Sequence, residues 1–195
     1  MLFLLIQKLV LIVNAKSRGY YKIEGAARAF NFDFRGKVVL DIGSSTGGFT
    51  QYALDCGAKQ VIAVEKGTNQ MISPLRHDPR VELHEKTNIF DFVCTSDVIL
   101  ADVSFISLTK ILAYAKNYLA NQSTEFLVML KPQFEAHDDQ LIKGVVKNEA
   151  IRRDIIKHFE QWLKTNNFVI INKRDNVLKG KTGNQERFYY LTLAK

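Results

Sequence analysis

A glycine-rich loop that directly follows a short apolar run most limits what this chain can fold into. The run, 38–42, is continuous rather than alternating, which is typical of a strand buried on both faces of a parallel sheet. The loop begins at its end, reads Asp41-Ile-Gly43-Ser-Ser-Thr-Gly47-Gly48-Phe49-Thr50, and opens onto a helical pattern. Because doubly wound α/β folds bind nucleotide-like ligands at such a junction, the loop predicts both that fold and that kind of site.

The rest of the chain continues the alternation of strands and helices. Further strands are predicted at 61–65, 81–84, 97–102, 126–130, 168–172 and 188–192, and helices at 20–30, 49–56, 108–119 and 149–166. The last two strands are joined by a polar stretch without a helical pattern, so an antiparallel pair is expected at one edge. The sequence therefore predicts one α/β domain over residues 17–195, with a seven-stranded, doubly wound, mostly parallel sheet and an antiparallel last strand.

The glycine-rich loop also indicates the kind of ligand. It reads G-x-x-x-G-G rather than the dinucleotide fingerprint G-x-G-x-x-G, and no GK[ST] follows it, so a phosphate cradle is not indicated. Glu65 ends the second strand, 24 positions after Asp41, where its carboxylate can accept hydrogen bonds from both ribose hydroxyls of a nucleoside. This spacing fits either NAD or S-adenosylmethionine, and the second carries no phosphate.

Asn88, just after the third strand, is a candidate to bind the adenine edge through its amide, although Asn is also a common turn residue. Tight turns alone also explain glycines in such a loop. We interpret the loop and the acidic residue together as a cofactor site. The predicted cofactor-binding residues are Asp41, Gly43, Ser44, Ser45, Thr46, Gly47, Gly48, Phe49, Glu65, Asn88 and Asp102.

Four ionisable residues occupy places that the predicted fold brings to one crevice. Lys22 lies in the first helix, Asp102 ends the fourth strand, Lys131 ends the fifth, and Glu186 leads into the last. Methyl transfer to a ribose hydroxyl needs a proton acceptor, and a lysine serves only if its pKa is lowered, which a second lysine does by like-charge repulsion. Lys131 is the predicted general base, while the two acids limit the total charge. Taken singly, each residue also fits a solvated or turn position.

Charge indicates a polyanionic partner. The chain has 27 Lys and Arg against 20 Asp and Glu, a formal net charge of +7. RNA, DNA and an anionic membrane all fit this charge. Arg18, Lys143 and Lys147 are the candidate RNA contacts if the polyanion is RNA. Arg152 and Arg153 are further candidates for phosphate contacts, although a solvated helix face explains both equally well.

The cysteines and the N-terminal segment indicate the cellular compartment of the protein. Cys56 and Cys94 are the only cysteines and form no CxxC motif, so neither a disulfide framework nor a metal site is expected, and a cytoplasmic location fits. The apolar segment 1–16 is too short to span a bilayer and is broken by Gln7 and Lys8. It also lacks the features of a signal peptide. We expect a packed appendage without stable membrane association, with an interfacial anchor or a homodimer surface as alternatives.

Five motifs occur in order along the chain: Ser17-Arg-Gly-Tyr-Tyr-Lys22-Ile-Glu24, the loop from Asp41 to Thr50, Asp102-Val-Ser-Phe-Ile-Ser107, Leu130-Lys-Pro-Gln-Phe-Glu135 and Gly183-Asn-Gln-Glu186. Together they resemble the TlyA (hemolysin A-like) branch of the FtsJ-type RNA ribose methyltransferases. The resemblance implies a Rossmann-like class I methyltransferase fold and S-adenosylmethionine as the methyl donor. It also implies 2′-O-methylation of cytidine in ribosomal RNA, with ribosomal RNA or ribosomal subunits as the partner.

The resemblance carries a catalytic Lys-Asp-Lys-Glu tetrad onto Lys22, Asp102, Lys131 and Glu186, the four residues selected above. Members usually carry an S4-like RNA-binding domain before the Ser-Arg-Gly motif, whereas sixteen residues stand there in this sequence, so we expect that domain to be lacking. No metal is expected, because the sulfonium of the donor already provides an activated methyl group.

Four alternatives stay open to different degrees. A nucleotide-dependent oxidoreductase fits the fold but not the loop, which lacks G-x-G-x-x-G. A phosphate-binding loop at Gly180-Lys181-Thr182 is disfavoured, because Asp175 stands where the motif requires a glycine. A non-catalytic RNA-binding or ribosome assembly factor would not need the tetrad. A membrane-active hemolysin-like protein is suggested by the family's name, and only the apolar N-terminal segment supports it.

Overall fold

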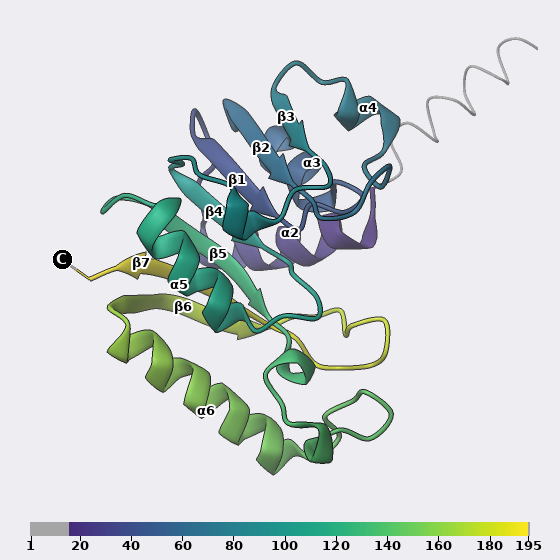
Figure 1. Cartoon of the computed structure of the whole chain (residues 1–195), viewed down its shortest axis with the longest axis vertical. Helices are drawn as coiled ribbons and strands as arrows, with labels where there is room; N and C mark the ends of the chain where they lie inside the picture. The colour runs from purple at the N-terminus through teal and green to yellow at the C-terminus, as the bar shows by residue number, and fades with distance from the viewer. Residues whose placement is uncertain (1–15, 195) are drawn as a thin grey trace, which may run out of the picture.

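The computed structural model describes residues 16–194, which form a single twisted sheet with helices on both faces (Figure 1). The strands follow the order β3-β2-β1-β4-β5-β7-β6. They are β1 (Val38–Ile42), β2 (Gln60–Val64), β3 (Val81–His84), β4 (Val98–Ala101), β5 (Glu125–Leu130), β6 (Phe168–Asp175) and β7 (Arg187–Leu193). The first five strands pair in parallel, and β7 lies antiparallel between β5 and β6. The predicted fold is confirmed.

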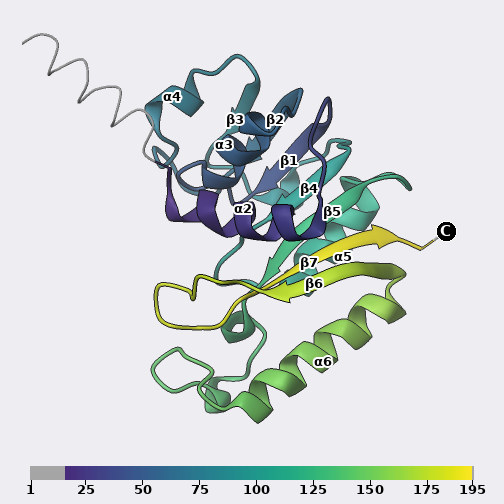
Figure 2. The same ribbon diagram turned by 180° about the vertical axis from the view of Figure 1, so that it is seen from behind.

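Helices cover the two faces of the sheet in separate layers (Figures 1 and 2). The helices are α2 (Arg18–Phe30), α3 (Gly48–Asp55), α4 (Ser73–Arg76), α5 (Leu108–Tyr118) and α6 (Glu149–Thr165), and the short 3-10 turns are η1 (Ile89–Asp91), η2 (Pro132–Phe134) and η3 (Asp138–Gln140). Helices α2 and α3 lie on one face, and α5 and α6 on the other. The sequence missed α4 and the 3-10 turns, because elements this short show no helical period.

Alternate residues of each central strand enter two separate hydrophobic cores. In β1, Val39 packs with α2 and α3, whereas Leu40 and Ile42 pack with α5 and α6. Strands buried on both faces need apolar residues at every position, which explains the continuous apolar runs of the sequence. Burying one such side chain contributes about 1.5 to 3 kcal/mol.

A close approach of two helices fixes where α2 lies. Ser17 caps the helix, its Oγ accepting a hydrogen bond from the backbone N–H of Tyr20 at 3.3 Å. Gly48, the first residue of α3, lies against this turn. A Cβ at Gly48 would stand 2.2 Å from Ser17 Oγ and 2.7 Å from Tyr20 N. Glycine at this position therefore lets α2 approach the loop that follows β1.

The predictions for the apolar N-terminal segment concern residues that, apart from Lys16, lie outside those described. The packed appendage and the homodimer surface both stay predictions for this reason. In the part of the chain that is described, no helix has the length and apolar character needed to cross a membrane.

Candidate active site

Strands β1, β4, β5 and β7 have ends that lie side by side at the carboxyl end of the parallel strands. The pairing register places Ile42 beside Ala101 and Leu130 beside Arg187. Since β7 is antiparallel, its first residue lies at the edge where the parallel strands end. The residues just beyond these strand ends are Gly43, Asp102, Lys131 and Glu186.

Two ion pairs bring the four predicted catalytic residues together. Lys22 Nζ lies 2.6 Å from Glu186 Oε2, and Lys131 Nζ lies 2.7 Å from Asp102 Oδ1. Only 9% of the Lys22 side chain and 3% of the Glu186 side chain are exposed. All four residues line one cavity of about 550 Å³, which we call the tetrad cavity. The desolvation of buried ion pairs offsets most of their attraction, so the two pairs contribute little to the stability of the fold. A chemical role of the four residues explains their arrangement better.

Lys131 has a second polar contact in the tetrad cavity. Its Nζ donates a hydrogen bond to Ser104 Oγ at 2.9 Å, in addition to the pair with Asp102. The amine is therefore held from two sides by the loop that follows β4. Each of the two lysines therefore lies against its own carboxylate.

The loop that precedes β7 is folded around the carboxylate of Glu186. Buried Asn176 donates through Nδ2 to Glu186 Oε2 at 3.5 Å, and its backbone N–H donates to the Glu186 carbonyl at 2.9 Å. Gly180 leaves room for the other carboxylate oxygen, since a Cβ there would stand 3.0 Å from Oε1. These contacts fix the position of the acid that pairs with Lys22.

Asn184 joins two loops beside the tetrad cavity. Its side chain is almost fully buried, with 1% of the residue exposed. Oδ1 accepts a hydrogen bond from Val146 N at 3.0 Å, while Nδ2 donates to Gly144 O at 3.0 Å and to Thr182 Oγ1 at 3.1 Å. One amide thus links the turn around Gly144 to the loop that carries Glu186.

A second cavity, of about 700 Å³, lies beside the first and shares a wall with it; we call it the nucleoside cavity. Glu65 lines it, and the Glu65 carboxylate is oriented by two backbone donors. Ser45 N donates to Oε2 at 2.9 Å and Gly67 N donates to Oε1 at 2.7 Å. The residues that line both cavities are Gly43, Ser45, Asp102, Ser104 and Phe105.

The glycine-rich loop packs closely against neighbouring parts of the protein. Gly43 has a φ of 80°, and a Cβ there would stand 3.3 Å from Asp102 O. Gly47 has a φ of 88°, and its Cβ would stand 2.5 Å from Leu75 Cδ1. Two buried oxygens beside the loop, Ser44 Oγ and Gln133 Oε1, have no hydrogen-bond partner among residues 16–194. The residues present therefore fit a nucleoside with a polar extension, as predicted for the cofactor.

Asp41 is a buried residue at the start of this loop. It is fully buried, and its Oδ2 accepts a hydrogen bond from Thr50 Oγ1 at 2.7 Å. Burial raises the pKa of Asp41 to about 7; the Thr50 hydrogen bond opposes this rise, and the charges of Asp102 and Glu65 add to it. Asp41 lines neither cavity, so its predicted part in cofactor binding runs through the loop conformation.

The other predicted cofactor residues divide between the two cavities. Glu65 and Asn88 line the nucleoside cavity. Asn88 also caps η1, accepting a hydrogen bond from Phe90 N at 3.4 Å, so it serves as a turn residue as well. Gly47 is buried behind the loop. Those that line the tetrad cavity alone are Ser44, Thr46, Gly48 and Phe49.

The residues predicted to contact RNA or phosphate differ in their burial and in their distance from the cavities. Arg18 lines the tetrad cavity and donates a hydrogen bond to the backbone carbonyl of Lys179. Lys143 and Lys147 are exposed, next to the turn that Asn184 holds, but line neither cavity. The prediction of a phosphate contact at Arg152 is wrong. That residue is 7% exposed and pairs with Asp175 at 2.6 Å, because the first turn of α6 packs against the strand ends.

Several cavity residues were not predicted. Phe105 is 92% exposed, has a φ of 63°, and lies with its ring centroid 5.2 Å from that of Phe134. An aromatic residue in a polar loop after a strand end was the signal that would have found it. Residues 180–182 form a loop, as expected, but this loop lines the tetrad cavity. The other unpredicted residues of that cavity are Ser17, Gly19, Ser104, Gln133 and Phe134.

A doubly wound sheet whose nucleoside cavity opens onto paired lysines and acids belongs, by class, to the Rossmann-like methyltransferases. The match to protein families agrees with this class. The model of the FtsJ-like methyltransferases matches residues 15–193, so the chain belongs to the FtsJ-like methyltransferase family.

Individual proteins of known sequence or structure are also similar to the chain. The chain is 36% identical over 183 residues to YqxC of Bacillus subtilis, described as a candidate rRNA methyltransferase, covering 90% of this chain and 64% of that protein. It is 35% identical over 181 residues to the 16S/23S rRNA (cytidine-2′-O)-methyltransferase TlyA of Mycobacterium tuberculosis, covering 90% and 67%. A Streptococcus thermophilus structure described as a candidate hemolysin matches with a TM-score of 0.87 at 33% identity, over 92% of this chain and 67% of that one. The chain thus spans about two thirds of the length of these relatives.

Proposed function

We propose that this chain transfers the methyl group of S-adenosylmethionine to a ribose 2′-hydroxyl of ribosomal RNA, with cytidine as the nucleoside. The observation that carries the proposal is the wall shared by the two cavities, where Asp102 of the tetrad also faces the nucleoside cavity. A donor held in one cavity can therefore reach a hydroxyl held in the other. The TlyA relative, whose name states this reaction, supports the choice of substrate.

The donor would be held by the residues around the nucleoside cavity. Glu65 keeps free lone pairs after accepting from Ser45 and Gly67, so it can accept hydrogen bonds from both ribose hydroxyls. Asn88 offers its amide to the adenine edge, and the loop at Gly43 allows close approach. S-adenosylmethionine supplies a methyl group that is activated by a sulfonium. No metal ligand takes part in this scheme.

The chain's own residues would handle the proton. Lys131, as the neutral amine, accepts the 2′-hydroxyl proton while the new oxygen–carbon bond forms and the carbon–sulfur bond breaks. Asp102 and Ser104 orient the amine and then stabilise the ammonium that results. Lys22, paired with Glu186, lines the same cavity and would position the ribose.

An RNA substrate also suits the mouth of the tetrad cavity. Phe105 presents an almost fully exposed ring there, and nucleic-acid bases stack on such rings. Arg18 on the same rim can contact a phosphate. The net charge of +7 favours a polyanion, and an enzyme of this kind acts where ribosomes are, in the cytoplasm.

Transfer of labelled methyl from S-adenosylmethionine to ribosomal subunits and to naked ribosomal RNA tests the proposal. The variant Lys131→Ala is expected to lower kcat by about 10²- to 10⁴-fold, the usual contribution of a general base, without loss of donor binding in calorimetry. The matched control is Lys59→Ala, which removes an exposed lysine far from both cavities and should transfer at the wild-type rate. Donor binding without transfer to either RNA, or full activity of Lys131→Ala, would contradict the proposal.

The hemolysin name of the Streptococcus structure raises a second candidate function, a membrane-active protein. Release of dye from liposomes tests it directly. We expect no release by the full chain at concentrations that support methyl transfer. Release that persists in Lys131→Ala, together with absent methyl transfer, would favour this candidate instead.

A further inference from the structure

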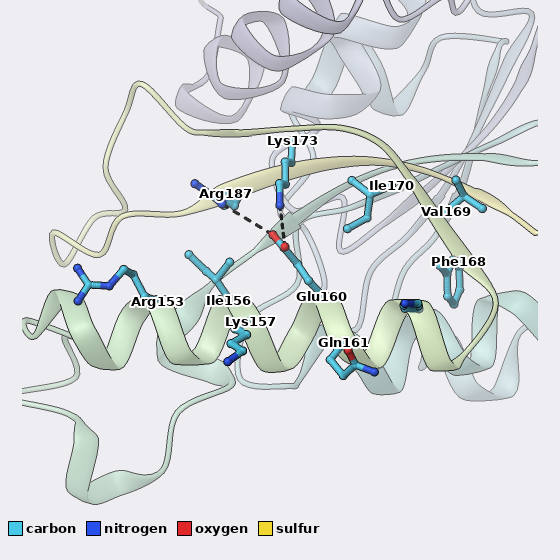
Figure 3. A pocket seen from close by; sticks show the side chains of 11 residues that line it. Arg153, Ile156, Lys157, Glu160, Gln161, Phe168, Val169, Ile170, Lys173 and Arg187 are labelled. Carbon is cyan, nitrogen blue, oxygen red and sulfur yellow. Dashed lines mark hydrogen bonds and ion pairs between the residues drawn. The ribbon is translucent and has the colours of Figure 1, made fainter.

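A basic groove lies between α6 and the edge strand β6, away from both cavities of the active site (Figure 3). Its volume is about 580 Å³, and it has an apolar floor that includes Phe168 and Val169. Five basic residues and a single acidic residue line it. They are Arg153, Lys157, Lys164, Lys173 and Arg187, with Glu160 as the acid.

The single acid is already engaged. Glu160 pairs with Lys173 at 2.6 Å and with Arg187 at 3.9 Å, and dashed lines in Figure 3 mark both ion pairs. Glu160 also accepts a hydrogen bond from the hydroxyl of Tyr189 at 3.0 Å. Arg187 is also paired with Asp175. The charges of the two strand residues are therefore balanced locally, whereas those of the three cations on α6 are not.

Those three cations form one stripe along α6. At about 100° per residue, Arg153, Lys157 and Lys164 lie within about 40° of one another around the helix axis. All three are exposed, and no ion pair to them is found within residues 16–194. The rise along the helix separates the first two by about 6 Å and the last two by about 10 Å, so the three charges follow one line along the helix.

One end of the groove is connected through α6 to the loop that carries Glu186. Arg152, in the first turn of α6, donates a hydrogen bond to the carbonyl of Gln185 at 3.3 Å, one residue before Glu186. Arg153 follows it on the groove side, and the stripe then runs along α6 away from the catalytic edge of the sheet. Arg187, which lines the groove, directly follows Glu186, which lines the tetrad cavity.

We propose that the groove between α6 and β6 binds the phosphate backbone of the RNA outside the nucleotide that is methylated. This inference rests on the proposed function for the identity of the polyanion. A concave site with cations on both walls suits a strand of phosphates better than a flat anionic membrane. Such contacts hold and orient RNA without reading its sequence, and they weaken as salt displaces them.

Binding of fluorescently labelled ribosomal RNA fragments, measured by anisotropy over a range of salt concentrations, tests the groove. The variant Arg153→Gln/Lys157→Gln/Lys164→Gln keeps the helix and removes the stripe. Three lost phosphate contacts should lower the slope of log Kd against log salt by about 2 to 3, and raise Kd roughly tenfold at moderate salt. Calorimetric binding of S-adenosylmethionine should not change.

The matched control, Arg28→Gln/Arg35→Gln/Lys59→Gln, removes the same charge from exposed positions remote from the groove. It should keep the wild-type slope. Equal slopes for the stripe variant and the wild type would overturn the inference, as would an equal loss in the control. Loss of binding to phosphatidylglycerol vesicles with unchanged RNA binding would assign the groove to a membrane and also overturn it. If the wild type transfers methyl groups but the stripe variant keeps the wild-type salt slope, only the inference about the groove is contradicted. If the stripe variant lowers the slope but the wild type transfers no methyl group, only the proposed reaction is contradicted.

Discussion

Asn184 shows how a buried amide can control a catalytic group that it does not touch. Its three hydrogen bonds join the turn at Gly144 to the loop that carries Glu186. The sequence placed this residue in a family motif but gave no sign of its contacts with Val146 and Gly144, since these residues lie about 40 residues away along the chain. Long-range hydrogen bonds of single side chains have no periodic signal in a sequence.

The variant Asn184→Ala should leave buried backbone groups unpaired. We expect the free energy of unfolding to fall by about 1 to 3 kcal/mol and kcat to fall with it, because the loop around Glu186 loosens. Donor binding at the nucleoside cavity should persist. Asn184→Asp keeps the acceptor for Val146 N and should recover part of kcat; recovery of stability without any recovery of kcat would contradict a positioning role.

Asp41 makes stability depend on pH in a direction that is unusual for an acid. Its pKa is about 7 in the folded chain, against an ordinary value near 3.8, so the folded state holds the proton more tightly. Below about pH 4 both states are protonated and nothing is lost. As pH rises from 4 to 7 the unfolded state ionises first, and stability falls by about 4 kcal/mol before it levels off.

The variant Asp41→Asn lacks this titration. Its stability relative to the wild type, from denaturant unfolding without cofactor, should rise between pH 4 and pH 7 and stay constant above. If the difference in the free energy of unfolding between Asp41→Asn and the wild type does not depend on pH, the pKa of Asp41 is the same in the folded and unfolded states, which contradicts the prediction. The strand-end position predicted Asp41 as a site residue, but burial decides its charge and is visible only in the fold.

At the scale of elements, the long strands and helices were predictable and their packing was not. Continuous apolar runs identified the strands at 38–42 and 126–130, because burial on both faces leaves a strong pattern. The insertion of β7 between β5 and β6 was not specified by that pattern, which predicted only an antiparallel pair at an edge. The phosphate contact expected at Arg152 failed for the same reason, since periodicity does not say what an arginine on a helix faces.

The contact between α2 and α3 gives a prediction at this scale. Gly48→Ala would place a Cβ against Ser17 Oγ and Tyr20 N, and the backbone atom cannot move aside. Helix α2 must then shift and carry Lys22 away from Glu186. We expect a loss of about 1 to 3 kcal/mol in the free energy of unfolding, with reduced kcat.

Gly25→Ala on the same helix is the matched control for this variant. A Cβ there meets nothing within 4 Å, so the substitution should stabilise the chain by about 0.5 to 1 kcal/mol and leave methyl transfer unchanged. Thermal unfolding and initial rates of both variants check the pair. Wild-type activity in Gly48→Ala would mean that the position of α2 does not limit the reaction.

The whole molecule combines a glycine-rich loop beside the nucleoside cavity, a cavity with paired charges and a basic exterior. The net charge of +7 was known from the sequence, but its concentration in the groove along α6 was not, since the groove forms only when α6 packs beside β6. The tetrad was predictable because strand ends converge in this fold, whichever side chains fill the space between them. The pairing of each lysine with one acid emerged only in three dimensions.

The position of the transferred methyl group tests the central claim most directly. Ribosomal RNA labelled by the wild-type chain is digested to nucleosides, and each labelled nucleoside is identified by mass and by its resistance to alkaline cleavage when still in the chain. The proposed function predicts label in a 2′-O-methylated ribonucleoside, chiefly cytidine, that disappears with Lys131→Ala. Label on a base, or ribose label that survives loss of Lys131, would contradict it.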